Sequence, residues 1–310
     1  MIMHILIIGA TGFIGRELMK ELTRAGHQPV AVSRNAHKAM EILGSQAEII
    51  EWDGLSPTDL AKHLGGFEAI VNLAGENIAA GRWTSRRKKL ITESRVKTCR
   101  LMLEAISLSS EKPSVLIQAS AIGFYGTPVD LPANEYQSAG TGFIAELTRD
   151  WESSVAPAGR MIPRIVMILT GLVLGKNGGL LEKMLLLFKF YCGTVIGSGK
   201  QWMSWIHIHD EVSAIRFLLE CGNCSGPYNL TAPNPVCMKA FIASIGEILG
   251  KPVWFKVPGL FLKAALGEMA NETVLSSQNI IPGKLLNEGF IFEYPHLTEA
   301  LKNLLTEKKS

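Results

Sequence analysis

The feature that most constrains this chain is a short apolar run near the N-terminus that turns on glycines into an amphipathic segment. Residues 4–8 predict a strand buried on both faces, and residues 13–25 carry apolar side chains at helical spacing. Residues 9–15, between them, read Gly-Ala-Thr-Gly-Phe-Ile-Gly. Backbone N–H groups at the start of a helix and the helix dipole both favour a negative charge there. The pattern therefore predicts a turn that binds the pyrophosphate of a dinucleotide.

Each of the three glycines in this turn has a separate physical task. Gly9 allows the tight turn, Gly12 lets phosphates approach the backbone, and Gly15 lets the helix pack closely against the strand. The alternative is a glycine-rich turn that binds no ligand. The position of the turn, between an apolar strand and a helix at the start of the chain, favours dinucleotide binding.

The end of the second predicted strand, at residues 29–33, indicates which dinucleotide is bound. Proteins that bind NAD place an acidic residue near this point to hold the ribose hydroxyls. Residues 26–39 contain no Asp or Glu, whereas Ser33, Arg34 and Lys38 offer hydroxyl and cationic donors suited to an additional phosphate. We therefore predict NADP rather than NAD, with a solvated loop arginine as the alternative interpretation of Arg34.

The strand-then-helix pattern repeats along the first half of the chain. Strands are predicted at residues 47–52, 67–73, 114–119 and 161–169, and helices at residues 85–107 and 142–156. This alternation predicts an α/β fold with a doubly wound parallel sheet of the Rossmann type. Ligands then collect at the carboxyl ends of the strands, where the glycine-rich segments fall and where Asp53 would lie beside the adenine.

The alternation weakens beyond Gly175. We expect a helix that ends near Lys189, a loop at residues 193–199, a helix at residues 211–220 capped by Asp210, and a last strand at residues 227–230. A proline-rich stretch at residues 231–235 is the best boundary candidate. The expected domains are a dinucleotide-binding domain at residues 1–232 and a smaller, mostly helical C-terminal domain at residues 233–310. Residues 171–200 are expected to contribute to the substrate cleft.

Composition and charge exclude several classes of partner. A net charge of +3 over 310 residues is too small to indicate nucleic-acid binding. The most apolar later stretch, residues 180–190, contains Glu182, Lys183 and Lys189 and is too short to span a bilayer. No secretory signal precedes the first strand, so we expect a cytoplasmic protein with no nucleic-acid or membrane partner.

The five cysteines are odd in number and scattered, and their spacing is not that of a disulfide framework. Cys221 and Cys224 form a C-x-x-C pair that resembles half of a metal or redox site. Because no second pair accompanies it, we predict no bound metal and no disulfide framework.

Several segments together are similar to one enzyme superfamily. Residues 9–15, 72–75, 120–126 and 205–210 resemble the extended short-chain dehydrogenases/reductases, which include nucleotide-sugar epimerases and dehydratases. A closer resemblance, to the atypical epimerase family of that superfamily, is carried by residues 72–78, Trp83, Ser94, Arg95, and residues 196–199 and 205–208. The tail resembles the C-terminal module of that family at Pro258, residues 267–270, Pro282, residues 289–290, Tyr294 and Pro295.

The resemblance implies NADP bound to the doubly wound domain, with a small C-terminal part over the cleft. Carried onto this chain, the expected cofactor-binding residues are Gly9, Thr11, Gly12, Phe13, Ile14, Gly15, Ser33, Arg34, Asp53, Leu73, Ala74, Gly75, Glu76 and Arg95. Small residues at 74–75 would let the ribose and nicotinamide pass close to the backbone. Two roles stay open for Glu76, cofactor hydrogen bonding or a helix cap, and two for Arg95, pairing with a phosphate or with a buried carboxylate.

The catalytic residues of the superfamily are not found at the matching positions. Active members use a Tyr as acid/base, a Lys four residues later that lowers its pKa, and a Ser or Thr that holds the substrate oxygen. The matching positions here hold Phe143, Leu147 and Ala121, and Leu169 stands where relatives commonly have Arg. The replacement candidates are Tyr125, Ser120 and His207, and each of the three also has a packing or capping role as its alternative.

Two functional hypotheses stay open on the sequence. The first is an NADP(H)-binding oxidoreductase or nucleotide-sugar epimerase-like enzyme that acts on a small-molecule carbonyl or nucleotide-sugar substrate, with a homodimer as an option. The second is a catalytically silent, NADP-sensing binding protein, which the loss of Tyr, Lys and Ser favours.

Overall fold

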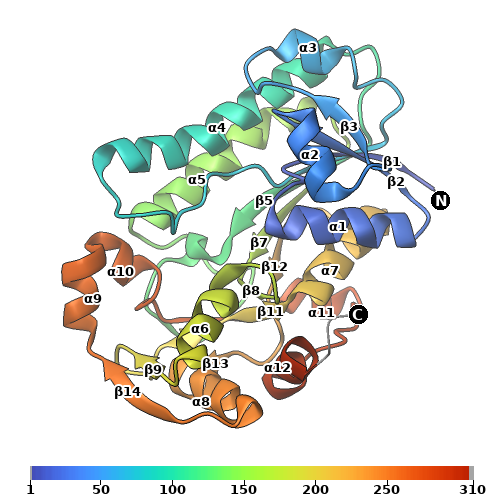
Figure 1. Ribbon diagram of the computed structural model, residues 1–310. Coiled ribbons are helices and arrows are strands. Elements are labelled where there is room, and N and C mark those ends of the chain that lie inside the picture. Colours follow the sequence, from blue (N-terminus) through green and yellow to red (C-terminus); the bar gives the residue numbers. More distant parts are fainter. Residues whose placement is uncertain (1, 307–310) are drawn as a thin grey trace.

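The computed structural model describes residues 2–306 and is built around a seven-stranded sheet (Figure 1). All neighbouring strands in this sheet run parallel, in the order β12-β7-β5-β4-β1-β2-β3. The strands are β1 (His4–Ile8), β2 (Gln28–Ser33), β3 (Glu48–Glu51), β4 (Ala69–Asn72), β5 (Val115–Ala121), β7 (Arg164–Thr170) and β12 (Gly226–Leu230). The order reverses at β1, where β4 lies on one side and β2 on the other. The predicted doubly wound parallel sheet is confirmed.

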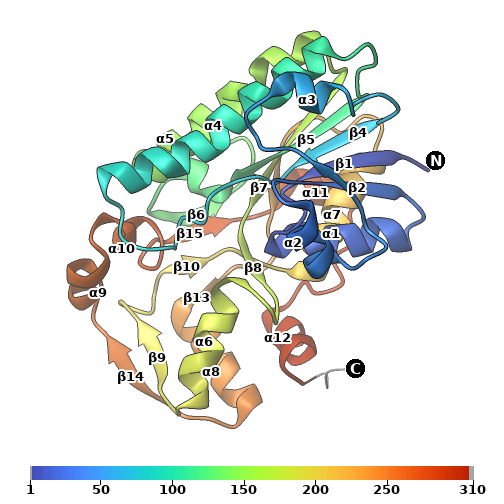
Figure 2. The ribbon, with the colours of Figure 1, turned by 45° about the horizontal axis from the view of Figure 1, so that its top comes forward.

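Helices cover both faces of the sheet. On one face α4 (Ser85–Leu108) packs beside α5 (Phe143–Val155), and on the other α1 (Phe13–Arg24) packs beside α7 (Ile208–Glu220) (Figure 1, Figure 2). The shorter helices α2 (Ala36–Leu43) and α3 (Pro57–Ala61) follow β2 and β3. Central strands buried from both sides explain the continuous apolar runs of the sequence. Leu6, for example, is fully buried between Val30 of β2 and Ile70 of β4.

The second half of the chain adds four two-stranded sheets, three of which join a C-terminal strand to an earlier segment. The pairs are β13 (Val236–Cys237) with β10 (Trp202–Met203), β14 (Val253–Val257) with β9 (Gly193–Ile196), β15 (Gln278–Ile280) with β6 (Val129–Ala133), and β11 (Trp205–His207) with β8 (Leu172–Leu174). The prediction of a loop at residues 193–199 was therefore wrong over β9. Its partner strand lies far along the chain, and the run is too short to show a strand pattern by itself.

The C-terminal region is mostly helical, as predicted. Its helices are α8 (Met238–Leu249), α9 (Gly259–Leu266), α10 (Glu268–Glu272), α11 (Gly283–Asn287) and α12 (Leu297–Thr306). A second apolar core joins α8 and α12 to α6 (Gly179–Lys189), so residues before and after the predicted boundary share it. The boundary between residues 232 and 233 stays a prediction.

The start of α7 also differs from the prediction. The helix begins at Ile208 with His207 as its N-cap, and His207 Nδ1 accepts a hydrogen bond from the backbone N–H of His209 at 3.0 Å. The fully buried Asp210 instead accepts hydrogen bonds from the N–H groups of Glu293 at 2.9 Å and Tyr294 at 3.0 Å. The prediction that Asp210 caps this helix was therefore wrong, and Asp210 anchors the C-terminal segment instead.

Two findings bear on the expectations about membranes and cysteines. Between residues 2 and 306, the search for a helix with the length and apolar character of a membrane span finds none. The sequence predicted no disulfide framework, and the structure nevertheless closes one local disulfide between Cys221 and Cys224. The two cysteines lie on either side of the sharp turn from α7 into β12, which brings their Cα atoms to 5.5 Å from each other.

Candidate functional site

A cleft of about 730 Å³ opens at the carboxyl ends of β1, β2 and β4. Of the residues predicted to bind the cofactor, it is lined by Gly9, Thr11, Gly12, Ser33, Arg34, Asp53, Leu73, Ala74, Gly75 and Glu76. Such a cleft, at the point where the strand order reverses, is where open α/β sheets bind ligands. Phe13, Ile14, Gly15 and Arg95 were also predicted to bind cofactor, but they do not line it.

The glycine turn between β1 and α1 has the backbone geometry that the sequence predicts. Gly9 has φ of 90°, and a Cβ atom there would lie 2.8 Å from the backbone carbon of Leu73. A Cβ on Gly15 would lie 2.4 Å from the carbonyl oxygen of Gly9, so α1 is pressed directly against the turn. Gly12 is the N-cap of α1, and no side chain caps the helix. The first turn of α1 therefore presents its N–H groups to the cleft.

The carboxyl end of β2 gives the cleft a positive wall. Arg34 and Lys38 both line it and are both exposed. Among residues 2–306, no carboxylate forms an ion pair with either side chain. Ser33 is the last residue of β2, and its hydroxyl donates to the carbonyl of Asn35 at 3.1 Å. Two cations without acidic partners among the described residues, in a concave surface, are the kind of surroundings that suit a phosphate.

Asp53 and Trp52 border the same cleft beyond β3. The Asp53 carboxylate accepts hydrogen bonds from the N–H groups of Leu55 at 2.7 Å and Ser56 at 3.2 Å, which fixes the turn. Trp52 Nε1 donates to the carbonyl of Ser56 at 2.8 Å. This turn, together with the apolar side chain of Ile42, forms a wall suited to a flat ring such as adenine.

Arg95 supports the cleft from behind. A Cβ on Gly75 would lie 3.0 Å from the Arg95 guanidinium, and Nη1 of Arg95 donates to the carbonyls of Glu76 and Ile91, each at 3.1 Å. The guanidinium also lies 4.9 Å from the ring of Trp151. Burial lowers the pKa of Arg95 to about 10, so the group stays charged at neutral pH. Its hydrogen-bond partners within the protein are these carbonyls and the Ser94 hydroxyl oxygen, and the choice between its two predicted roles stays a prediction.

Two further residues of the predicted set have roles that the sequence left open. Glu76 forms an ion pair with Arg87, with Oε1 and Nη2 3.0 Å apart at the edge of the cleft. Phe13 packs away from the cleft: a Cβ on Gly178 would lie 2.5 Å from its ring, and one on Gly175 2.7 Å. The side chain after the glycine turn therefore connects α1 to the turn that precedes α6.

The three catalytic candidates are all buried and lie outside the lining of the cleft. The Tyr125 hydroxyl donates to Asn229 Oδ1 at 2.8 Å, and burial raises its pKa. His207 is the N-cap of α7, its ring lies 4.0 Å from that of Tyr294, and burial lowers its pKa to about 4. Ser120 donates to Glu152 Oε1 at 2.6 Å, and burial raises the pKa of that carboxyl group.

The first turn of α5, which holds Phe143 at the position predicted to match the superfamily's Tyr, is packed and capped by tertiary contacts. Phe143 stacks edge-on against Trp83 with ring centroids 4.9 Å apart, and the Lys88 ammonium lies 4.7 Å from the Phe143 ring. The Glu272 carboxylate of α10 accepts hydrogen bonds from the N–H groups of Phe143 at 3.0 Å and Ile144 at 2.8 Å. Sequence reasoning missed Glu272 and Glu152 because both lie far along the chain from their partners.

Comparison with known proteins shows which protein families the sequence of this chain matches. Its sequence matches the NAD dependent epimerase/dehydratase family over residues 5–144 and a domain of unknown function, DUF1731, over residues 257–304. The epimerase family protein YfhF of Bacillus subtilis is 37% identical over 311 residues, which cover 99% of this chain and 100% of that protein. The chloroplastic SDR39U1 homologue of Arabidopsis thaliana is 36% identical over 312 residues, covering 98% of this chain and 87% of that protein.

Solved structures of similar proteins have the same fold as this chain. The crystal structure of the human epimerase family protein SDR39U1 with NADPH has a TM-score of 0.87 at 30% identity, covering 99% of this chain and 100% of that one. The UDP-glucose 4-epimerase of Thermus thermophilus in complex with NAD has a TM-score of 0.77 at 17% identity, covering 96% and 97%, and shows the shared fold. Because relatives at more than 30% identity extend over nearly its whole length, this chain belongs to the epimerase family represented by YfhF and SDR39U1.

Proposed function

We propose that this protein binds NADP(H) in the cleft between β1, β2 and β4. The observation that carries the proposal is the combination of an uncapped helix start behind the glycine turn with two unpaired cations, Arg34 and Lys38, at the end of β2. The first suits a pyrophosphate, and the second suits the additional phosphate that distinguishes NADP from NAD. The NADPH in the crystal structure of human SDR39U1 supports the same cofactor.

The residues present fit each part of this cofactor. The turn formed by Gly9, Thr11 and Gly12 would hold the pyrophosphate. A side chain on Gly9 would collide with the backbone of Leu73, which is why a glycine stands at this position of the turn. Ser33, Arg34 and Lys38 would bind the 2′-phosphate, and the Asp53 turn would border the adenine. The backbone at residues 73–75 would lie along the second ribose and the nicotinamide, with Arg95 holding that loop in place.

We propose further that the protein is an oxidoreductase or epimerase-like enzyme that acts on a small carbonyl compound or nucleotide sugar. Bound NADP(H) would supply or accept the hydride. The chain must then exchange a proton, and Ser120 with Glu152 is the pair best suited to do so. Ser120 lies at the carboxyl end of β5, and the raised pKa of Glu152 keeps a proton on that carboxyl group to higher pH than on an exposed one.

Tyr125 and His207 are less suited to proton exchange near neutral pH. The hydroxyl of Tyr125 is committed to Asn229, and its raised pKa makes it a weaker acid than a free phenol. His207 uses Nδ1 as the N-cap of α7, and its lowered pKa keeps the ring neutral.

The cytoplasmic location and the homodimer stay predictions.

A second candidate function is a silent NADP-sensing protein. It is favoured by Phe143, which fills the position of the usual Tyr with an apolar ring packed against Trp83. A screen of aldehydes, ketones and nucleotide sugars for NADPH consumption separates the two candidates. Turnover with any compound supports the enzyme, whereas tight cofactor binding without turnover or isotopic hydride exchange supports the sensor.

The cofactor assignment predicts the effect of replacing Arg34. In Arg34→Ala the affinity for NADPH should fall about 10- to 100-fold, since charged hydrogen bonds contribute about 1.5–3 kcal/mol. Affinity for NADH should not change, because NADH lacks the phosphate that Arg34 would bind. Calorimetry on ligand-stripped protein measures both, with the exposed Arg100→Ala on α4 as the control. An equal loss for the two coenzymes would contradict the assignment, and no heat with either coenzyme for the natural protein would overturn it.

The proton-exchange pair predicts a separate result. With a substrate found in the screen, Ser120→Ala should lower kcat about 10²- to 10⁴-fold without changing the affinity for NADPH. In the reductive direction the natural protein should lose activity as pH rises through the raised pKa of Glu152, and Glu152→Gln should remove this dependence. Thermal unfolding of both variants checks that they fold. An unchanged kcat in Ser120→Ala would rule the pair out.

A further inference from the structure

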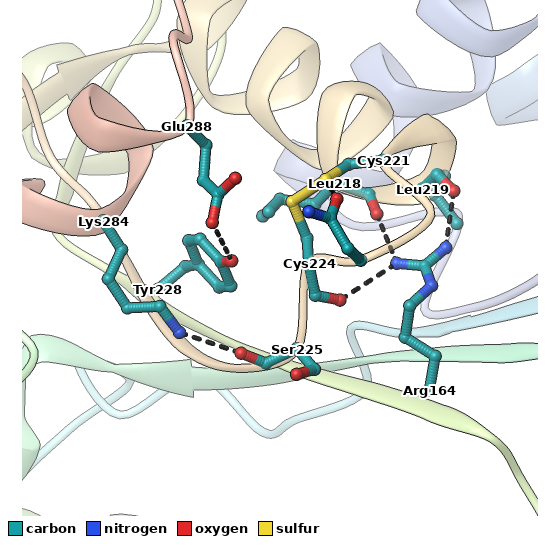
Figure 3. The surroundings of a disulfide bond; sticks show 10 residues. Arg164, Leu218, Leu219, Cys221, Cys224, Ser225, Tyr228, Lys284 and Glu288 are labelled. Carbon is teal, nitrogen blue, oxygen red and sulfur yellow. Dashed lines mark hydrogen bonds between the residues drawn. A yellow bond between two sulfur atoms is a disulfide. The ribbon is translucent and has the colours of Figure 1, made fainter.

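The disulfide between Cys221 and Cys224 lies in a polar corner at the C-terminal end of α7. Cys221 caps the C-terminus of α7 and is half-buried, whereas Cys224 is fully buried just before β12. Figure 3 shows Tyr228 and Glu288 on one side of the pair and Arg164 on the other. No residue of this corner lines the proposed cofactor cleft.

A third ligand atom lies within reach of both sulfur atoms. A carboxylate oxygen of Glu288, which follows α11, and the sulfur atoms of Cys221 and Cys224 all lie within 4.8 Å of one another. Over the described part of the chain, these residues form the one group of three or more His, Cys, Asp or Glu side chains with ligand atoms so close. The C-x-x-C spacing is that of zinc ligands, and carboxylates also bind zinc.

The surroundings hold these ligands in place. The Tyr228 hydroxyl donates to Glu288 Oε1 at 3.3 Å. The Arg164 guanidinium donates to the carbonyls of Leu218 at 2.6 Å and Leu219 at 2.7 Å, and it therefore fixes the end of α7 independently of the disulfide. Lys284 donates to the carbonyl of Ser225 at 2.8 Å, just after Cys224. The two cations partly balance the charge of a site with three anionic ligands.

We propose that Cys221, Cys224 and Glu288 form a redox-gated site for a soft divalent cation, with Zn²⁺ as the natural candidate. Two thiolates select zinc over Mg²⁺ or Ca²⁺, which prefer oxygen ligands. Because Glu288 is exposed, water can complete the fourth position. The bound ion would join the turn between α7 and β12 to the C-terminal region at the end of α11.

The gate is the disulfide itself. A dithiol reductant attacks the more exposed Cys221 sulfur, and the Sγ–Sγ bond breaks. Two electrons and two protons pass to the two sulfur atoms, and the reductant becomes a disulfide. Zinc binding then displaces the two thiol protons into solvent. In the oxidised protein the sulfur atoms are bonded to each other and cannot act as thiolate ligands.

Metal titration of the full chain tests the site. The protein is reduced with dithiothreitol, desalted without oxygen, and titrated with Co²⁺ and Zn²⁺ beside an oxidised sample. The reduced protein should bind one equivalent of Co²⁺ with sulfur-to-cobalt charge-transfer absorption, Zn²⁺ should displace it, and the oxidised protein should bind none. The same result is expected in a Cys192→Ser/Cys237→Ser background, which removes the two other partly exposed thiols.

Variants separate the proposed ligands from chance binding by thiols. Cys221→Ser and Cys224→Ser should each abolish the charge-transfer band, and Glu288→Gln should weaken Zn²⁺ affinity at least tenfold. Tyr228→Phe, which removes the hydrogen bond to Glu288, should weaken it about tenfold, while the exposed Glu299→Gln should leave it unchanged. Absence of stoichiometric binding in the reduced protein would overturn the proposal. Binding of unchanged affinity in Cys221→Ser or in Glu288→Gln would also overturn it. Both variants alter partly or fully exposed side chains, so both are expected to fold.

Discussion

Single residues in this molecule act through neighbours that are distant in the chain. Arg95 is an example, because its guanidinium donates to the carbonyls of Glu76 and Ile91 and packs against Gly75. A Cβ atom on Gly75 would lie 3.0 Å from this guanidinium, so a side chain there would press on Arg95. The shape of the cofactor cleft thus depends on a residue that does not line it.

Glu211 is a buried carboxyl group that neither proposal uses. It is fully buried in the first turn of α7, and Oε1 accepts a hydrogen bond from the Thr170 hydroxyl at 2.8 Å. Oε2 has no hydrogen-bond partner. Burial raises the pKa of Glu211 to about 8, so the folded protein keeps this carboxyl group neutral at pH 7.

This raised pKa predicts a dependence of stability on pH. Between the ordinary pKa of 4.5 and about 8, the folded state holds a proton that the unfolded state has lost. The free energy of unfolding should therefore fall as pH rises, with a limiting slope of about 1.4 kcal/mol per pH unit. Glu211→Gln should remove this contribution and become more stable than the natural protein toward pH 8.

Urea unfolding of both proteins at pH 5, 6.5 and 8 measures the difference. The exposed Glu104→Gln on α4 should keep the pH dependence of the natural protein. If Glu211→Gln follows the same slope as the natural protein, Glu211 is charged in the folded state and its surroundings contain an unrecognised partner.

At the scale of elements, helix ends are stabilised by residues from other segments. The N-cap of α5 is Gly142, which has no side chain, and the Glu272 carboxylate of α10 takes over the capping of Phe143 and Ile144. A carboxylate at a helix N-terminus also interacts favourably with the helix dipole. The contact ties the C-terminal region to the start of α5.

Replacing Glu272 should therefore cost stability. Glu272→Ala is expected to lower the free energy of unfolding by about 1–2 kcal/mol, which is the usual loss when a helix cap is removed. The matched control is Glu268→Ala on the same helix. Glu268 pairs with Lys88 at 2.5 Å but is largely exposed, so its loss should cost about 0–1 kcal/mol. Equal losses in chemical denaturation would show that the cap contributes nothing beyond a surface charge.

At the scale of the whole molecule, the two largest apolar cores are built from interleaved parts of the chain. The larger core lies on both faces of the main sheet, and the second joins residues on α6 and β11 to residues on α8 and α12. The last helix therefore closes a core that begins before residue 180. Strand pairing also joins the C-terminal region to earlier residues, because β14 pairs with β9 in a two-stranded sheet.

The second core predicts a large effect at the C-terminal end. Leu301 of α12 is fully buried in this core, so Leu301→Ala should lower the free energy of unfolding by about 2–5 kcal/mol. The adjacent exposed Lys302→Ala should change it by less than about 0.5 kcal/mol. Thermal and urea unfolding measure both. A small loss in Leu301→Ala would mean that α12 is dispensable for the second core.

The parts of the site that sequence reasoning located are those made by continuous segments. Gly9, Thr11 and Gly12 follow one strand directly, and Arg34 follows the next, so the chain itself brings them to one edge of the sheet. Ser120 was predicted on other grounds, as the neighbour of Ala121, which holds the Ser/Thr position of the superfamily. Its partner Glu152 was not, because the hydrogen bond spans two elements and no local pattern marks it.

The amino-acid sequence by itself determined the parallel sheet, the glycine turn and the positive end of β2, because strand burial, helix periodicity and turn chemistry are local properties. The tertiary structure decided what each polar side chain contacts: Arg95 meets carbonyls, Asp210 anchors residues 293–294, and Glu288 reaches the cysteine pair. These contacts join segments far apart in the chain, and their geometry depends on packing that no local pattern encodes.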